Sequence, residues 1–359
     1  MTMDPHSVRR REVLGMASTI PLAAIAGCLD VLAGADRHEY ANAIPTDGTT
    51  DTDGVFFVHV DAEWLRAFDG TEELPYAETF PDAVDFSIDP HSPPVTVDPL
   101  LAYPAAAFVA GAVRIGLGLV PYGFGDVILD GVFEDVASDH ADDPQQAVDE
   151  PDVDGTVRID SMLLVDDVGV FRGAFDARTI VGAARDFEPV GERADFDRYE
   201  GSDAGVFGTD GLAFAVRDDL LVTLFDDEAS LDPVLASIAD DADGLGDGDD
   251  GGWALEEAGH GHISLGAWGV DPERAADGQD HEFVATPDVL EDATGVVSSL
   301  TLGPDEGVGT MAVRYETEAT PQRAVFERQI GTSASARDID LRDGRAAVAG
   351  IWRVPDANG

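Results

Sequence analysis

Two histidines separated by one glycine, His260 and His262, have the residue type and spacing that come nearest to a metal site in this chain. They precede an apolar run at 263–268, and a strand beginning there would place both imidazoles on one face. Imidazole nitrogens bind zinc and copper. The pair is a weak signal, because histidines where a strand begins are usually surface residues, so we predict no metal site. Partners for such a site would come from Glu256, Glu257 and His281.

Other side chains that could do chemistry carry less information. The pair Asp166–Asp167 could serve acid–base catalysis, but a chain with 72 Asp+Glu forms such pairs by number alone. The Asp/Gly-rich run at 240–252 fails the EF-hand template, because the glutamate required at position twelve, counted from Asp247, falls on Ala258. The chain has no lysine, which excludes Walker-type phosphate loops and Schiff-base catalysis. We predict no catalytic residue and no cofactor.

The clearest chemical signal lies at the N-terminus. Arg10 and Arg11 precede a short, weakly apolar stretch, and Ile25–Ala26–Gly27 leads directly into Cys28. Paired arginines before a mild apolar region are typical of a twin-arginine export signal, and small residues before a cysteine are typical of a lipidation site. Cys28 is the only cysteine, so an internal disulfide is excluded. We predict export and attachment of lipid to Cys28.

The net charge of −51 indicates the solvent in which the chain folds. Such self-repulsion destabilises a compact state in ordinary salt, but at 1 M salt the Debye length falls to about 3 Å. Because 44% of residues are hydrophobic, a folded halophilic protein is favoured over a disordered chain. Residues 1–30 and the overall composition resemble the twin-arginine-exported lipoproteins of halophilic archaea. This resemblance implies a cell-envelope location but no known activity.

The segment 99–125 stands out because it contains no carboxylate and its sole charge is Arg114. Three interpretations are open: a buried helix with a Gly-rich connection, a contact with the membrane surface, or a true membrane span. Pro104, Arg114 and the glycines weaken the span. A single acyl-type chain gives only marginal membrane binding, so stable attachment needs either a second chain on Cys28 or a second membrane contact, for which this segment is the candidate. Nucleic acid is excluded as a partner, because no cluster of basic residues follows Cys28.

The composition also divides the chain into segments. Residues 1–27 are the predicted signal peptide, and residues 28–54 are the lipidated cysteine followed by a flexible Gly/Thr/Asp-rich tether. A first α+β unit is predicted at 55–240 and carries the insert 99–125. An acidic Gly-rich linker is predicted at 241–252, and a second α+β unit at 253–359.

The two units show a similar order of elements, strand–strand–helix–strand–strand, each with an apolar strand upstream, at 55–60 and 263–268. In the first unit we predict strands at 157–165, 168–175, 212–216 and 220–225, with helices at 178–185 and 231–238. In the second unit we predict strands at 296–302 and 309–317, a helix after Thr320–Pro321, and a closing hairpin at 339–352. This pattern predicts an α+β fold that arose by internal duplication, with an antiparallel sheet and one or two helices in each unit.

These observations favour an exported, lipid-anchored envelope protein of a halophile, held on the outer face of the cell membrane. Its ectodomain is predicted to be a non-enzymatic binding or structural module with an unidentified protein or ligand partner. The alternative is an extracytoplasmic hydrolase or metal-dependent enzyme. A pocket that gathers several histidines would favour the enzyme; the histidines to compare are His59, His260, His262 and His281.

Overall fold

The computed structural model describes residues 40–46, 48–49, 54–66, 98–137, 157–202, 209, 211–269, 288–303, 306–316 and 322–353. These residues belong to one compact unit, Arg37–Gly359. Arg10, Arg11, Cys28 and His281 lie outside the described residues.

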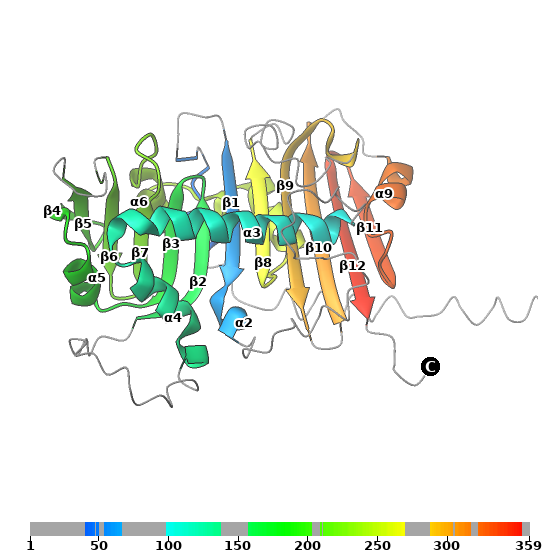
Figure 1. Cartoon of the computed structure of the whole chain (residues 1–359). Helices are drawn as coiled ribbons and strands as arrows, with labels where there is room; N and C mark the ends of the chain where they lie inside the picture. Colours follow the sequence, from blue (N-terminus) through cyan, green and yellow to red (C-terminus); the bar gives the residue numbers. More distant parts are fainter. Residues whose placement is uncertain are drawn as a thin grey trace, which may run out of the picture. The chain divides into compact units, whose positions relative to one another are not determined.

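Twelve strands form one sheet in the order β11-β12-β10-β9-β8-β1-β2-β3-β7-β6-β5-β4 (Figure 1). Every neighbouring pair is antiparallel, and β1 pairs with β8 where the two predicted units meet. The strands are β1 (Val55–Asp61), β2 (Arg158–Val165), β3 (Val168–Ala174), β4 (Phe187–Arg193), β5 (Phe196–Gly201), β6 (Ala213–Arg217), β7 (Leu220–Leu224), β8 (Ile263–Trp268), β9 (Ala293–Leu302), β10 (Glu306–Tyr315), β11 (Ala336–Arg342) and β12 (Arg345–Arg353).

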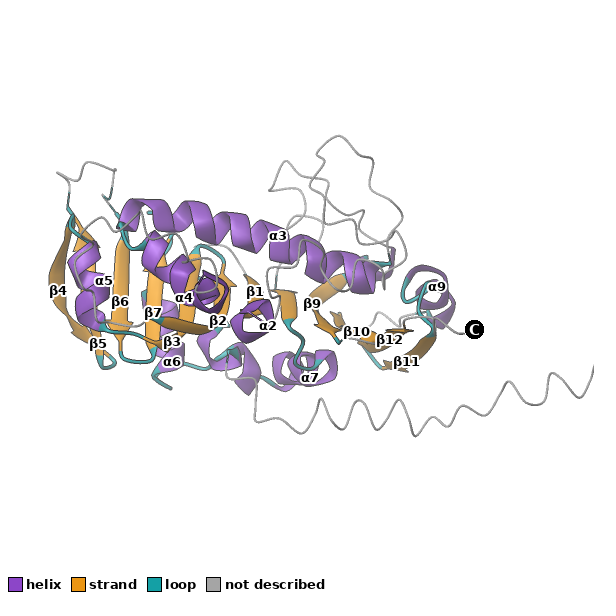
Figure 2. Cartoon of the chain, turned by 60° about the horizontal axis from the view of Figure 1, so that its bottom comes forward, coloured by secondary structure: helices purple, strands orange, loops and turns teal. Residues whose placement is uncertain are grey.

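One long helix, α3 (Pro99–Leu119), crosses the strands on one face of the sheet (Figures 1 and 2). Near its start, Leu100 and Leu101 join a core cluster with β9, β10 and β12. Near its end, Ile115 and Leu119 join a second cluster with β2, β3 and β7. The other helices on this face are α2 (Ala62–Arg66), α4 (Gly125–Ala137), α5 (Ala177–Ala183) and α9 (Arg323–Gln329), and the 3-10 turns η2 (Val120–Tyr122) and η5 (Asp288–Leu290) adjoin α3 and α9.

The opposite face is covered by shorter elements. Helix α6 (Asp232–Ile238) and helix α7 (Asp249–Ala258) lie there, as Figure 2 shows, with the 3-10 turns η1 (Ala41–Ala43) and η4 (Leu245–Asp247). Val234 and Leu255 pack with Phe57 of β1 and Val222 of β7 in one continuous cluster. The sheet therefore has an apolar core on each side, in a three-layer arrangement.

Most of the predicted elements are confirmed. The strands predicted at 55–60 and 263–268 are β1 and β8, and the α+β class with antiparallel pairing is correct. The predicted separation into one sheet per unit is wrong, because β1 pairs with β8 and joins all strands into a single sheet. Strand β10, predicted at 309–317, is covered on both faces. Met311 and Val313 pack on the α3 side, and Ala312 is fully buried on the other side, where α7 lies.

The boundaries of the polar segments also differ from the prediction. The acidic linker predicted at 241–252 contains η4 and the first turn of α7, where the exposed Asp249 and partly exposed Asp250 occupy the N-terminal positions that favour negative charge. Within the predicted tether at 28–54, Tyr40 and Ile44 are buried, and Pro45 forms a β-bridge with Gly244. The folded part of the chain therefore begins before residue 55.

Two strands and three helices were not predicted: β4, β5, α2, α4 and α7. Strands β4 and β5 lie at one end of the sheet, and their residues are mostly exposed, so they lack the alternation of apolar residues that marks a half-buried strand. Helix α4 follows η2 directly after Gly123, which has the left-handed conformation that glycine tolerates (φ 78°).

Candidate functional site

The outward face of α3 and η2 is the most unusual surface among the described residues. Val113 is 52% exposed, Leu117 is 67% exposed and Val120 is 65% exposed. These three residues follow each other at intervals of four and three, so they form one stripe along the helix. Partly exposed Ala106 and Val109 continue the stripe toward the helix N-terminus. This surface, called the apolar stripe below, consists of Ala106, Val109, Val113, Leu117 and Val120.

A buried aspartate holds the N-terminus of α3. The Asp98 carboxylate caps the helix by accepting from the Leu100 N–H at 3.3 Å, and Pro99 takes the first helical position. The same carboxylate accepts from the Gly331 N–H at 2.8 Å and from the Ser333 N–H and hydroxyl, both at 3.1 Å. Asp98 is only 5% exposed, so it ties α3 firmly to the connection between α9 and β11.

A buried tyrosine holds the other end. The Tyr122 hydroxyl donates to the Ala213 carbonyl at 2.9 Å and accepts from the Leu224 N–H at 3.0 Å, which links η2 to β6 and β7. Burial raises the pKa of Tyr122, so the hydroxyl keeps the proton that it donates. Between the two ties, Gly118 lets the helix approach Phe225 closely, because a Cβ there would lie 2.5 Å from the ring.

The single charge of α3 is neutralised within the protein. The Arg114 Nε donates to the Asp167 carboxylate at 2.9 Å, and its Nη2 bonds to the same carboxylate. Asp167 lies in the turn between β2 and β3, where Asp166 has a positive φ of 48°. Arg114 therefore pairs with the sheet and does not contribute charge to the apolar stripe.

The segment Pro99–Tyr122 is long and apolar enough to cross a membrane by length and composition. The buried-helix interpretation is confirmed for one side of α3, where ten residues are buried. The helix continues through Pro104. The next helix differs, because α4 exposes Leu129 together with Asp126 and Asp130.

The two histidines singled out by their spacing do not meet. His260 packs edge-on against Tyr40, with ring centroids 5.7 Å apart, and Tyr40 belongs to the core on the α7 side. His262 stacks on Trp64 at 5.2 Å, and Trp64 packs edge-on against Phe108 of α3. The imidazoles therefore turn to opposite faces of the sheet.

His262 has a structural contact of its own. Its Nδ1 accepts from the Leu302 N–H at 3.1 Å, and burial lowers its pKa against the smaller opposing effect of Asp61. His59 stacks on Tyr40 at 4.2 Å. Among the described residues no group of three His, Cys, Asp or Glu side chains is placed to hold a metal ion.

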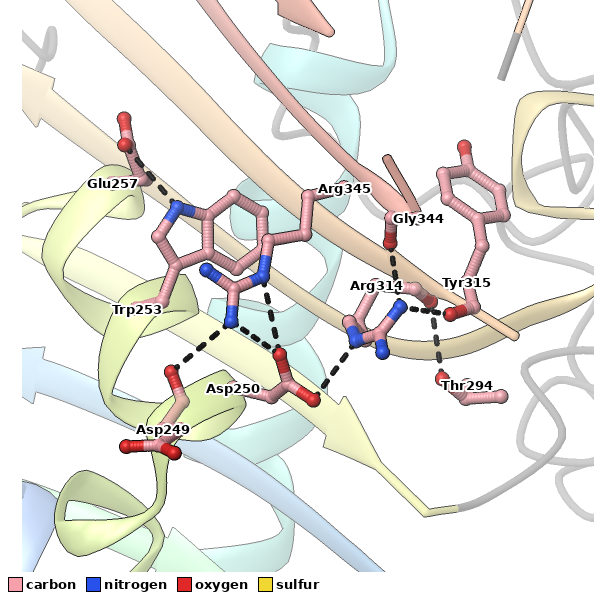
Figure 3. Close-up of polar contacts among 9 residues, drawn as sticks. All are labelled: Asp249, Asp250, Trp253, Glu257, Thr294, Arg314, Tyr315, Gly344 and Arg345. Atoms are coloured by element: carbon pink, nitrogen blue, oxygen red, sulfur yellow. Dashed lines mark hydrogen bonds and ion pairs between the residues drawn. The ribbon is translucent and has the colours of Figure 1, made fainter. Parts of the chain in front are cut away.

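An ionic cluster joins α7 to the neighbouring strands β10 and β12 (Figure 3). Asp250 lies between two arginines: Arg314 Nε at 2.9 Å and Arg345 Nε at 3.1 Å. Arg345 also lies over the ring of Trp253, 4.8 Å from its centroid. Partial burial would raise the pKa of Asp250, but hydrogen bonds and charge from both arginines outweigh it and lower the pKa. This cluster clamps α7 onto the sheet.

The described residues line a small cavity beside Tyr40 and a groove beside Asp250. A cavity of about 100 Å³ touches Tyr40, Arg172 and Arg217, and it is smaller than the few hundred Å³ of typical ligand sites. A shallow groove of about 490 Å³ lies beside the Asp250 cluster. Its Arg314 already bonds to Asp250 and to the carbonyls of Tyr315 and Gly344.

Three glycines where α7 begins have the G-x-G-x-x-G spacing of a dinucleotide-binding turn: Gly246 and Gly248 precede the helix and Gly251 lies in its first turn. They follow α6 and a turn, whereas that motif follows a strand. Asp247, exposed Asp249 and partly exposed Asp250 would repel a pyrophosphate.

Sequence reasoning missed Asp98 and Tyr122 as the residues that position α3. The dipeptide Asp98–Pro99 is a recognisable helix start. For Tyr122 the sequence holds no signal, because its partners lie about ninety to one hundred residues away. Arg10, Arg11 and Cys28 lie outside the described residues, so the export signal and the lipidation site stay predictions.

Comparisons with known proteins add little. No protein-family model and no curated protein matches this chain. Crystal form III of a protein named TP0453 resembles it with a TM-score of 0.39 and 7% identity, over 88% of this chain and 94% of that chain. Crystal form IV gives the same TM-score and identity, over 88% of this chain and 92% of that one. A likeness this weak supports no conclusion about function.

Proposed function

We propose that this chain is an exported, lipid-anchored protein of the cell envelope of a halophile. The observation that carries the proposal is the position of Cys28, the only cysteine, behind Arg10–Arg11 and twelve residues before Tyr40, where the described fold begins. A twin-arginine signal carries folded cargo. The net charge of −51 supports folding in concentrated salt.

We propose further that the ectodomain binds a partner or serves a structural role and does not catalyse a reaction. Its buried or clustered polar groups act as ties between elements. Asp98 holds α3 to the α9–β11 connection, Tyr122 holds η2 to β6 and β7, and Asp250 holds α7 to β10 and β12. His262, the residue directly before β8, accepts a hydrogen bond from the Leu302 N–H of β9.

We infer that the sheet arose by duplication. Outward from the pair β1 and β8, one side of the sheet reads β1-β2-β3-β7-β6 and the other reads β8-β9-β10-β12-β11. Strands β5 and β4 extend the first side beyond β6 and have no counterpart on the second. On both sides the last strand in the chain pairs with the third strand, and the strand before it lies further out: β7 then β6 on one side, β12 then β11 on the other. Helices α5 and α9 occupy the same place, after the third strand. Superposing the two sets of five strands in a crystal structure tests this inference, and strands that run in unmatched directions would contradict it.

The anchor is tested by mass spectrometry of the protein purified from membranes of the producing cell. We expect a mature chain that starts at Cys28 and carries lipid mass on that residue. The Cys28→Ser variant should carry no lipid. Because the readout is the lipid itself, it does not depend on any other membrane contact.

Export is tested by changing Arg10 and Arg11 together to lysine, which should leave the protein in the cytoplasm because the receptor reads the arginine pair. Arg9→Lys is the matched control and should be exported normally. Unmodified Cys28 in the native protein, or normal export of the double variant, would contradict the proposal.

A further inference from the structure

We propose that the apolar stripe of α3 and η2 lies against the lipid surface of the membrane and is the second attachment of the ectodomain. The inference rests on the proposed envelope location. In this proposal the apolar stripe contacts the acyl region just below the lipid headgroups. An interfacial helix of this kind buries its apolar face about 5–10 Å into that region.

The charge distribution identifies the occupant. About one residue in five of the chain is acidic, yet residues 99–125 contain no carboxylate. The only charge in this segment, Arg114, is paired with Asp167. A protein that needs acidic groups over its surface in salt would not leave a stripe of Val113, Leu117 and Val120, each more than half exposed, facing water.

The packing of α3 favours a contact at the surface over a span. A span would pull Leu100, Leu101 and Leu119, each at most 1% exposed, away from the sheet. It would also break the Asp98 and Tyr122 ties, leaving backbone N–H groups of Gly331 and Leu224 without these acceptors. A helix that lies flat keeps all these contacts and still buries the stripe.

The predicted anchor can reach the same membrane. Tyr40 belongs to the core on the face opposite α3. The twelve residues from Cys28 to Tyr40 span at most about 40 Å. A sheet with one helix layer of 10–12 Å on each face is about 30 Å thick. A lipid on Cys28 and the apolar stripe can therefore contact one bilayer at the same time.

The test uses residues 29–359, which lack Cys28 but contain the whole compact unit Arg37–Gly359. Flotation with phosphatidylcholine vesicles in about 3 M KCl measures the partition of the protein into lipid. The parent should bind, and its binding should strengthen with added KCl, because salt favours apolar burial over electrostatic attraction. Vesicles containing phosphatidylglycerol should bind equally well at high salt.

Val113→Glu should lower the partition about tenfold, and the triple variant Val113→Glu/Leu117→Glu/Val120→Glu more than a hundredfold. The matched control is Val190→Glu on β4, because Val190 is 49% exposed and Val113 is 52% exposed. Val190→Glu should bind like the parent. Circular dichroism confirms that each variant is folded.

Three results would overturn the proposal: no binding of the parent in 3 M KCl, equal losses for Val113→Glu and Val190→Glu, or unchanged binding of the triple variant. Sedimentation that shows a dimer dissolved by the triple variant, without vesicle binding, would instead assign the stripe to a second copy of the chain. These results concern the stripe alone, since the mass of Cys28 tests the anchor separately.

Discussion

Helices α3 and α7 cover opposite faces of the same sheet and bury similar small and apolar residues against it, but their outward faces differ. The outward face of α7 carries the exposed Asp249 and Glu256 and the partly exposed Asp250 and Glu257. The outward face of α3 carries Val113 and Leu117 and no carboxylate. The outward face of α7 is therefore acidic and suited to concentrated salt, whereas the outward face of α3 is apolar.

The attachments of the two helices differ in the same way. The first turn of α7 is held by Asp250, whose side chain is 40% exposed, through its ion pairs with two arginines. The ends of α3 are held by Asp98 and Tyr122, which are 5% and 1% exposed. Breaking buried hydrogen bonds of this kind lowers the free energy of unfolding more than breaking exposed ion pairs does. The contrast indicates that α3 is held rigidly while its outer face stays open.

The largest expected effect is at the start of α3. Asp98→Ala should lower the free energy of unfolding by about 3 kcal/mol or more, because the N–H groups of Leu100, Gly331 and Ser333 lose one shared buried acceptor. Chemical denaturation in concentrated KCl measures the loss. Asp249→Ala, at the exposed start of α7, is the control and should cost less than about 1 kcal/mol. Equal losses of stability in the two variants would contradict the contrast between the buried start of α3 and the exposed start of α7.

A smaller effect is expected at the other end of α3. Tyr122→Phe keeps the buried ring and removes the hydroxyl that bonds to Ala213 and Leu224. The free energy of unfolding should fall by about 1–2 kcal/mol. Tyr199→Phe is the control, because Tyr199 is a partly exposed ring that also stacks in this cluster. A neutral Tyr122→Phe would show that packing alone holds this end of the helix.

The smallest effect concerns α7 and depends on pH. The pKa of Asp250 is lowered in the folded chain, so its stabilisation is present above the unfolded pKa of about 3.8 and is lost as pH falls through the lower folded value. Asp250→Asn should therefore lower the free energy of unfolding at pH 7 by less than about 1 kcal/mol, which appears as a slightly lower Tm. The gap to the native chain should close as pH falls below about 3.8 and through the lowered pKa of Asp250 in the folded chain.

Asp249→Asn serves as the control for this measurement, because its backbone carbonyl and not its carboxylate faces Arg345 (Figure 3). At pH 7 its Tm should lie closer to that of the native chain than the Tm of Asp250→Asn does, because Asp249→Asn removes only a charge at the helix N-terminus and no ion pair with an arginine. A gap between Asp250→Asn and the native chain that stays constant down to pH 2 would contradict an ionised Asp250 as the group that clamps α7.

Local patterns predicted the strands that are apolar on at least one side, including β1 and β8 to within one residue. They did not predict β4 and β5, because exposed strands near a sheet edge carry no apolar alternation. They also placed His260 and His262 on one face. The two residues precede the regular part of β8, so the alternation of a strand does not govern their directions.

The sequence alone determined the composition of α3 and of the chain around it: an acid-free segment at 99–125, one cysteine at position 28 and a charge of −51. These properties are sums over residues or short spacings, so no fold is needed to read them. Only the tertiary structure decided which side of α3 is buried and that Arg114 meets Asp167. Apart from the local cap on Leu100, the partners of Asp98 and Tyr122 lie between about ninety and 235 residues away, and only the tertiary fold brings them together.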